Sequence, residues 1–212
     1  MTEILHLAER APLPADALRK AAEGARGCKV VAFPTDTVYG IGSTGLIKAA
    51  ARRIYQIKER PNHKPLPIMV WSVAEAQRWV QWTPAAETLA KRFWPGALTL
   101  VLKPTEQGRI LTFAEYSTIA IRIPNHPVAL RLLEQSGVPW AVTSANKTGE
   151  LALSDGASVA KEFNGLVDFI IDGGKVSGIE STLVDATQPQ VRLLREGSIS
   201  RSTIFEALGQ TS

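Results

Sequence analysis

One short segment of the chain gathers a surplus of positive charge. Its charged residues are Lys48, Arg52, Arg53, Lys58, Arg60 and Lys64 against Glu59. The formal net charge of the whole protein is only +4, so this segment alone accounts for the excess. Concentrated cations are typical of an anion site, although a solvated helix face has the same composition. Lys58 and Arg60 stand just before Pro61, so we expect them at a helix end and in the loop that follows.

Hydroxyl and carboxyl side chains follow the first predicted strand. After Phe33 the chain places Thr35, Asp36 and Thr37 ahead of the glycines at 40 and 42. If the backbone stays extended, Thr35 and Thr37 fall on one side and Asp36 on the other. Hydroxyls at a strand end bind small polar ligands well because they both donate and accept hydrogen bonds. The alternative is a capped turn, in which these side chains satisfy only local backbone groups.

Two arginines and two further polar residues are also candidates. Ser144 and Asn146 follow a predicted strand and share one side of it. Arg122 lies within an apolar strand, where an unpaired cation would cost several kcal/mol, so it needs a carboxylate from the protein or from a ligand. Arg195 stands at the end of another strand in the same way. A structural ion pair is the alternative interpretation for each arginine.

One segment matches the glycine spacing of a dinucleotide-binding fingerprint but not its structural context. The segment 40–45 reads Gly-Ile-Gly-Ser-Thr-Gly, and Glu59 stands near the place of a ribose-binding acid. Residues 34–39 separate the segment from its strand, and Glu59 follows a helix instead of ending a second strand. The sequence also lacks a Gly-x-x-x-x-Gly-Lys-Ser/Thr loop, so a nucleotide would be held without a P-loop.

Composition limits the class of protein. The chain has 212 residues, of which 45% are hydrophobic and 21% charged, as in an ordinary globular enzyme. Cys28 is the only cysteine, so no intramolecular disulfide can form and we expect a reducing, cytoplasmic setting. The N-terminus lacks the features of a signal peptide, and no apolar run approaches the roughly 20 residues that span a membrane. The three histidines are scattered, so no structural metal is expected, whereas Mg²⁺ could arrive with a phosphate ligand.

Periodicity predicts the elements that would position these residues. Apolar or alternating runs predict strands at 29–33, 67–71, 97–103, 118–123, 140–143, 169–171, 182–185 and 191–194. Helical spacing predicts helices at 16–25, 47–58, 73–80, 84–93, 126–135, 155–163 and 202–208. Lys58 shares the buried face of its helix with Ile54, so it points inward. Because some strands follow one another without a helix, we expect an α/β fold with a mixed sheet, in a single domain over residues 1–212.

Seven motifs occur in order along the chain. They read Pro-Thr-Asp-Thr-Val-Tyr-Gly at 34–40, Lys-x-Arg-Pro at 58–61, Pro-Gly-Ala-Leu-Thr at 95–99, Thr-Ile-Ala-Ile-Arg at 118–122, Ser-Ala-Asn at 144–146, Glu-Ser-Thr-Leu-Val-Asp at 180–185 and Leu-Arg-Glu-Gly at 194–197. Each is weak alone, but together they are highly specific. From about residue 16 to 197 the chain resembles the YrdC-like threonylcarbamoyl-AMP synthases. The resemblance implies a twisted, open α/β sheet flanked by helices, with a concave basic pocket.

The resemblance also implies an activity. Members of this family are nucleotidyltransferases that join L-threonine, bicarbonate and ATP into L-threonylcarbamoyladenylate and release pyrophosphate. The adenylate then serves the threonylcarbamoyl transferase machinery that forms N6-threonylcarbamoyladenosine at position 37 of tRNA. Because this reaction brings two anions together, its site needs cations and positioning more than covalent participation by the protein. Mg²⁺ is expected to share the charge of the triphosphate.

By the same resemblance the candidate residues take roles. Lys58 and Arg60 would be the catalytic pair that neutralises the triphosphate. The threonine substrate would be bound by Thr35, Thr118, Arg122 and Ser181. ATP would be held, besides Lys58 and Arg60, by Asn62, Ser144, Asn146, Ser154 and Arg195. Lys48, Arg52 and Arg53 would then be solvated surface residues.

Two departures and two rival hypotheses accompany this resemblance. The loop Asn62-His63-Lys64 adds a cation and a histidine, and longer relatives carry a second domain that can close over the site. The first rival is a module that binds tRNA, rRNA or double-stranded RNA without catalysis, which a pI near 9.3 allows. Against it, the aromatic residues are few and do not interleave with the basic ones as a stacking platform would. The second rival is a related carbamoyl-nucleotide enzyme with another amine substrate.

Overall fold

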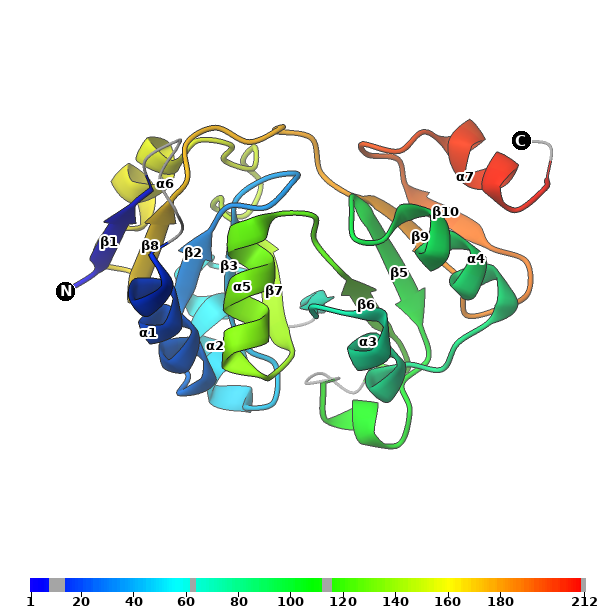
Figure 1. The fold of residues 1–212 in the computed structure, drawn as a ribbon, viewed down its shortest axis with the longest axis horizontal. Helices are drawn as coiled ribbons and strands as arrows, with labels where there is room; N and C mark the ends of the chain where they lie inside the picture. The colour runs from blue at the N-terminus through cyan, green and yellow to red at the C-terminus, as the bar shows by residue number, and fades with distance from the viewer. Residues whose placement is uncertain (8–13, 62–63, 112–115, 211–212) are drawn as a thin grey trace.

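One ten-stranded sheet forms the centre of the protein, as seen in a computed structural model that describes residues 1–7, 14–61, 64–111 and 116–210 (Figure 1). The strands are β1 (Glu3–His6), β2 (Val31–Phe33), β3 (Gly40–Thr44), β4 (Ile68–Met69), β5 (Leu98–Leu102), β6 (Ile119–Arg122), β7 (Trp140–Ser144), β8 (Phe169–Asp172), β9 (Thr182–Asp185) and β10 (Arg192–Arg195). Their spatial order is β1-β8-β2-β3-β7-β4-β6-β5-β9-β10. β1 with β8, β8 with β2, β4 with β6, and β5 with β9 run parallel, and the other neighbours run antiparallel. The expected open, mixed α/β sheet is therefore confirmed.

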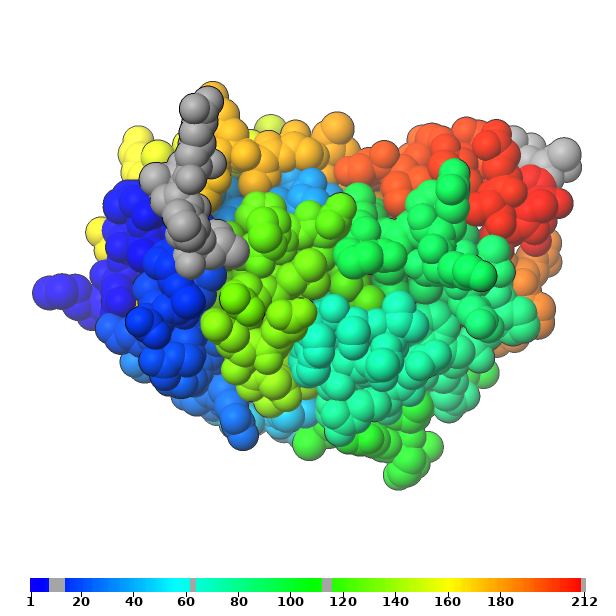
Figure 2. All heavy atoms as spheres, viewed as in Figure 1, coloured from blue at the N-terminus to red at the C-terminus, as the bar shows by residue number. Residues whose placement is uncertain are grey.

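Helices cover both faces of this sheet. α1 (Ala15–Arg26), α3 (Val73–Trp79) and α5 (Pro127–Ser136) lie in front of it in Figure 1, and Figure 2 shows them as one continuous surface. α2 (Lys48–Ile57) lies on the opposite face, and α6 (Gly156–Phe163) lies beside β8. α4 (Pro84–Phe93) and α7 (Arg201–Ala207) pack together near β9 and β10, and a short 3₁₀ helix, η1 (Gln107–Leu111), contacts α3.

Side chains mark where several helices begin. Ser72, Thr83, Asp155 and Ser200 each accept a hydrogen bond from a main-chain N–H in the first turn of the helix that follows. α5 ends at Gly137, which has a φ of 63° and so adopts the left-handed conformation that favours glycine. With such local signals, the helices predicted at 73–80, 84–93, 126–135, 155–163 and 202–208 lie within one residue of the observed bounds.

β1, β3 and η1 lie outside the predicted elements. β3 escapes prediction because glycine is uncommon inside strands. Gly42 is nevertheless suited to its place, since a Cβ there would lie only 2.9 Å from a side-chain methyl of Val142 and 3.2 Å from the main-chain oxygen of Ala141. Gly40 and Gly42 therefore lie inside a buried strand and not in a phosphate-binding loop, which excludes the dinucleotide fingerprint.

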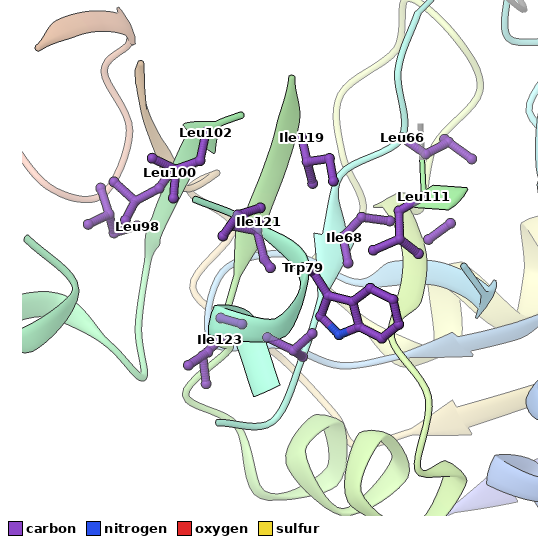
Figure 3. Packing of buried hydrophobic residues seen from close by; sticks show 14 of the residues in the cluster. Leu66, Ile68, Trp79, Leu98, Leu100, Leu102, Leu111, Ile119, Ile121 and Ile123 are labelled. Atoms are coloured by element: carbon purple, nitrogen blue, oxygen red, sulfur yellow. The ribbon is translucent and has the colours of Figure 1, made fainter. Parts of the chain in front are cut away.

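Two apolar layers hold the sheet between its helices. Between the sheet and the α1/α5 pair, the rings of Phe33 and Trp140 meet edge to face with centroids 5.4 Å apart. Farther along the sheet, around β4 to β6, Trp79 of α3 belongs to one apolar cluster with aliphatic side chains of the middle strands, and Ile68 and Leu111 lie near its ring in Figure 3. Those labelled on β5 and β6 are Leu98, Leu100, Leu102, Ile119 and Ile121. The packed strands fix the positions of the polar residues that stand at their ends.

Candidate functional site

A cavity of about 490 Å³ lies along the middle of the sheet. Its walls come from strands β3 to β7, β9 and β10, from the loop 34–39 and from the segment that follows α2. Glu180 and Ser181 close it from the crossover 173–181, which joins β8 to β9 and runs along one edge of the molecule in Figure 1. Its volume lies within the range of about 300–1,000 Å³ that is common for small-molecule sites.

The charged groups of this cavity are mostly cations. Among the described residues that line it, those with a charge are Arg60, Lys64, Arg122, Arg195 and Glu180. Four cations facing one carboxylate attract anionic ligands. The cationic segment 48–64 contributes two of them, Arg60 and Lys64.

Arg122 is held from three sides. It is only 4% exposed, and its Nε donates a hydrogen bond to the main-chain oxygen of Gly96 at 2.9 Å. One terminal nitrogen donates to Thr37 Oγ1 at 2.9 Å and the other to Asp36 Oδ1 at 2.7 Å. Burial lowers the pKa of the Arg122 guanidinium, and the charge of Asp36 opposes this. The protein thus supplies the carboxylate that this buried cation requires, so a ligand carboxylate is not needed to explain its burial.

The hydroxyls of Thr35 and Thr37 form a directed chain. Thr35 Oγ1 donates to the main-chain oxygen of Val38 at 2.6 Å and lies 3.0 Å from Thr37 Oγ1. Because Thr35 uses its one proton on Val38, Thr37 donates to Thr35 and accepts from Arg122. Residues 34–39 form a loop, so Asp36 and Thr37 turn to the same partner, and the simple alternation of an extended strand is wrong. The hydroxyl proton of Thr35 belongs to the loop, as in the capped-turn alternative.

Lys58 lies beneath the cavity and not in its wall. It caps the end of α2 and is 2% exposed, so its inward direction is as the helix face predicted. Its Nζ donates to the main-chain oxygen of Ser144 at 2.5 Å and to Asn146 Oδ1 at 2.7 Å. Burial, and to a smaller extent the charge of Arg60, lowers the pKa of Lys58 to about 8, against an opposing effect of Glu180. These two acceptors use two of the three N–H groups of Nζ, and Lys58 is not among the described residues that line the cavity, so in this structure it supports the site through Ser144 and Asn146.

Asn146 is likewise committed to the protein. Its Oδ1 also accepts from Ser144 Oγ at 2.6 Å, and its Nδ2 donates to the main-chain oxygens of Lys147 and Glu150 at 3.0 and 2.7 Å. Asn146 is not among the lining residues, whereas Ser144 is. In this structure Asn146 shapes the turn that presents Ser144, and its nucleotide contact stays a prediction.

Arg60 keeps a donor free beside the cavity. One terminal nitrogen donates to the main-chain oxygen of Pro65 at 3.0 Å, while its buried Nε finds no partner within the described part of the chain. Burial lowers the pKa of the Arg60 guanidinium. A buried, unpaired N–H of a cation favours an anionic acceptor, because the unmet hydrogen bond carries a desolvation penalty.

Arg195 and Ser181 form the opposite part of the wall. Arg195 donates to Glu180 Oε2 at 2.7 Å and, through another nitrogen, to the main-chain oxygen of Ser181 at 2.9 Å. Ser181 Oγ lies 2.8 Å from Thr99 Oγ1, which belongs to β5. The guanidinium is therefore oriented by the crossover, and its ion pair with Glu180 is half exposed.

The structure brings most of the predicted residues together. The seven that line the cavity are Thr35, Arg60, Thr118, Arg122, Ser144, Ser181 and Arg195. Lys58 and Asn146 lie beneath them, and Asn62 lies outside the described residues. Ser154 is half-buried and is not among the lining residues, and its main-chain oxygen accepts from Val176 at 2.8 Å; its nucleotide contact stays a prediction.

The remainder of the basic segment divides into two kinds of surface. Lys48 and Arg52 are exposed, as predicted. Arg53 is half-buried instead, because its guanidinium pairs with Asp168 at 2.5 Å on the strand side of α2. Arg53 keeps 39% of its side chain exposed and is therefore partly solvated.

Thr37, Lys64, Thr99 and Glu180 also line the cavity, although the family resemblance assigned them no role. Thr37, Thr99 and Glu180 lie within the seven motifs, and Lys64 belongs to the loop with the added cation. Membership of these motifs was thus the signal that could have identified them.

No group of three or more His, Cys, Asp or Glu side chains gathers as a metal site within the described residues. None of the described helices is both long and apolar enough to cross a bilayer.

Fold and cavity together define an open-sheet α/β protein with a cavity whose charged lining residues, within the described chain, are mostly cations. Residues 25–197 match the family that groups Sua5, YciO and YrdC and is described as telomere recombination. The chain is 40% identical to threonylcarbamoyl-AMP synthase of Pyrococcus abyssi over 99% of its length, and 39% identical to that of Bacillus subtilis over 91%. It spans only 62% and 56% of those two relatives. The chain belongs to the Sua5/YciO/YrdC family.

Solved structures of this family have the same fold. Sua5 of P. abyssi, complexed with L-threonine, superposes with a TM-score of 0.90 at 38% identity, covering 100% of this chain and 62% of that one. YciO of E. coli gives a TM-score of 0.87 at 28% identity, covering 96% of this chain and all of that one. The YrdC-like architecture expected from the motifs is therefore confirmed.

Proposed function

We propose that the protein is an L-threonylcarbamoyladenylate synthase, a nucleotidyltransferase acting on L-threonine, bicarbonate and ATP. One observation carries the proposal: each of the seven motifs contributes at least one residue to the lining of a single cation-rich cavity. The names of the P. abyssi and B. subtilis relatives support it, as does the L-threonine bound to Sua5 of P. abyssi.

The proposed reaction has two bond-forming steps. Threonine, with its amine protonated, and bicarbonate give an N-carboxy anion, one water and one proton as a C–N bond forms and a C–O bond breaks. A carboxylate oxygen of this anion then bonds to the α-phosphorus of ATP, while the bond from that phosphorus to pyrophosphate breaks. Both partners in the second step are anions, so the protein must neutralise and align them.

The cavity residues divide between these tasks. Arg60 and Arg195 would hold the phosphates, since the planar guanidinium matches phosphate oxygens. Arg122, with Thr118 and Ser181, would bind threonine. Ser144 would contact the nucleotide, positioned by Asn146 and by the ammonium of Lys58 beneath it. The contacts proposed for Asn62 and Ser154 rest on the family resemblance alone.

Mg²⁺ fits this site as a companion of ATP. It commonly takes one or two carboxylates and completes its shell with phosphate oxygens and water. Glu180 is the one carboxylate among the described lining residues, beside the hydroxyl of Ser181. When bound, the ion would share the charge of the triphosphate. Transfer of the adenylate to a threonylcarbamoyl transferase that acts on tRNA, in the cytoplasm, follows from the proposed activity.

A pyrophosphate-release assay tests the proposal. We expect ATP-dependent release that requires both L-threonine and bicarbonate, and formation of the threonylcarbamoyl adenylate in the same mixture. Omission of either co-substrate should reduce release to background. Robust release without threonine would contradict the assignment, as would tight tRNA binding with no release under any of these conditions.

A further inference from the structure

Asp36 does not line the cavity, yet it sets the charge of one of its walls. Its Oδ1 accepts from Arg122 at 2.7 Å and from the main-chain N–H of Asn125 at 3.0 Å. The side chains of Arg122 and Asp36 are 4% and 17% exposed, so water screens their interaction little. The pair is a neutral unit, held between the loop 34–39, β6 and the start of α5.

Arg122 still has donors for a ligand. A guanidinium has five N–H groups, and hydrogen bonds to Gly96, Thr37 and Asp36 use three of them within the described residues. One N–H on each terminal nitrogen is left, at a residue that lines the cavity. This wall therefore offers directed donors without net charge.

The other charged lining residues differ in this respect. Among the described lining residues, Arg60, Lys64 and Arg195 are balanced by one carboxylate, Glu180, which leaves that group with a net positive charge. The ammonium of Lys58 is close enough to Arg60 for that charge to lower the pKa of Lys58. Arg195 is also close enough to lower the pKa of Arg122, so without Asp36 the positive potential would extend to Arg122.

We propose that Asp36 is a specificity-determining residue: by neutralising Arg122 it makes this part of the cavity accept a zwitterion, such as an amino acid, and reject free phosphate anions. The physical reason is that an extra −1 charge repels a ligand roughly in proportion to the net charge of that ligand. A zwitterion has none, whereas a phosphate dianion has two. This inference rests on the proposed function, because it takes the amino acid to be L-threonine.

Calorimetric titration of L-threonine with and without inorganic phosphate tests this role. In the wild-type protein phosphate should leave the Kd of threonine unchanged, because phosphate binds among Arg60, Lys64 and Arg195. In Asp36→Asn, which keeps an oxygen acceptor for Arg122 and Asn125, phosphate at about 10 mM should raise that Kd about tenfold, by competition at Arg122. Thr37→Val removes another acceptor of Arg122 without changing charge, and Asp185→Asn removes a carboxylate paired with Arg192 outside the cavity. Neither should introduce phosphate competition.

The outcomes separate this inference from the proposed function. If phosphate leaves the Kd of threonine unchanged in both the wild-type protein and Asp36→Asn, Asp36 does not select ligands by charge. The same conclusion follows if Thr37→Val introduces equal competition, since geometry and not charge would then matter. If the wild-type protein binds no threonine, the proposed function fails. A direct phosphate titration then decides the role of Asp36: an additional phosphate site in Asp36→Asn supports it, and unchanged binding overturns it.

Discussion

Lys58 combines deep burial with a functional position at one residue. Its ammonium is held by two neutral oxygens, from Ser144 and Asn146, and by no carboxylate within hydrogen-bonding distance among the described residues. Neutral acceptors replace water only in part, so the charged form is disfavoured and the pKa of Lys58 is lowered to about 8. The protein keeps this charge where a phosphate ligand would benefit from it, at the expense of its own stability.

This balance predicts a pH dependence of stability. The unfolded lysine holds its proton up to its ordinary pKa of 10.5, whereas the folded one loses it near pH 8. Between these values the unfolded state binds more protons, so the contribution of Lys58 to stability rises with pH, by about 3 kcal/mol in all. We expect the free energy of urea unfolding of the wild-type protein to rise relative to Lys58→Met from pH 8 to pH 10. Parallel curves for the two proteins would show that burial does not disfavour the charge.

Arg60 carries a prediction about nucleotide affinity. Arg60 lines the cavity and its buried Nε has no hydrogen-bond partner among the described residues, so in the proposed function this guanidinium binds phosphate. Removing a charge-assisted hydrogen bond of about 1.5–3 kcal/mol should weaken ATP binding about 10- to 100-fold in Arg60→Ala, with threonine binding unchanged. Calorimetry with each ligand measures this. Arg52→Ala, an exposed arginine of the same segment, is the control and should bind ATP normally. Equal losses in the two variants would point to a general charge effect.

For single residues, the sequence predicted which way a side chain points better than it predicted which residue the side chain contacts. The helix face showed that Lys58 points inward, and the apolar strand showed that Arg122 needs a carboxylate. The partners lie far along the chain, because Asn146 is 88 residues from Lys58 and Asp36 is 86 residues from Arg122. Local periodicity carries no information on which distant loop closes on a given side chain. Asp36 was therefore the residue that pattern reading placed wrongly.

Among the elements, the loop 34–39 and the crossover 173–181 form one supporting unit. Tyr39 Oη donates to the main-chain oxygen of Gly174 at 2.8 Å and accepts from the N–H of Gly173 at 3.0 Å. The N–H of Gly178 donates to the main-chain oxygen of Thr37 at 2.7 Å. Burial raises the pKa of Tyr39 to about 12, so the phenol stays protonated and keeps donating throughout the neutral range.

Tyr39→Phe should loosen this crossover without changing the sheet. It leaves a carbonyl and an N–H of the glycine pair without their partner, which costs about 1–3 kcal/mol. We expect lower stability to urea and faster amide hydrogen exchange at 173–181, together with weaker ATP binding because Glu180 orients Arg195. Exchange in α1, which lies apart from the crossover in Figure 1, is the internal control. Unchanged exchange at 173–181 would show that the main-chain hydrogen bond from Gly178 to Thr37 is sufficient to hold the crossover in place.

Element prediction succeeded where a segment obeys a single period. α4 and β9 have the predicted bounds, because Thr83 and Pro84 mark the start of the helix and residues 182–185 alternate in burial. β3 was not predicted because it contains glycines. Those glycines are needed because the side chain of Val142, on the neighbouring strand β7, leaves no room for a Cβ. β1 has only four residues and is formed as a strand through its pairing with β8. Elements that depend on a distant partner cannot be recognised from their own residues.

For the whole molecule, the continuity of the sheet predicts cooperative unfolding. All ten strands of the described chain belong to one sheet, which is consistent with the proposal of a single domain over residues 1–212. The two halves meet where β4 pairs with β7 over only two residue pairs. Three of the five tryptophans, Trp79, Trp82 and Trp94, lie in or next to α3 and α4 of the β4 half, whereas circular dichroism reports on both halves. We expect coincident urea transitions by fluorescence and circular dichroism. Separate midpoints would show two units that unfold independently.

The place of β8 in the sheet bears on how the protein is synthesised. β8 lies between β1 and β2, two strands that leave the ribosome far earlier. Until about residue 172 has emerged, β1 has no strand to pair with and β2 presents an open edge. Open edges pair readily with other chains, which is how nascent proteins begin to aggregate. Synthesis therefore passes through a long vulnerable interval that ends only when β8 inserts, and a stall between β7 and β8 should make the nascent chain a client of chaperones.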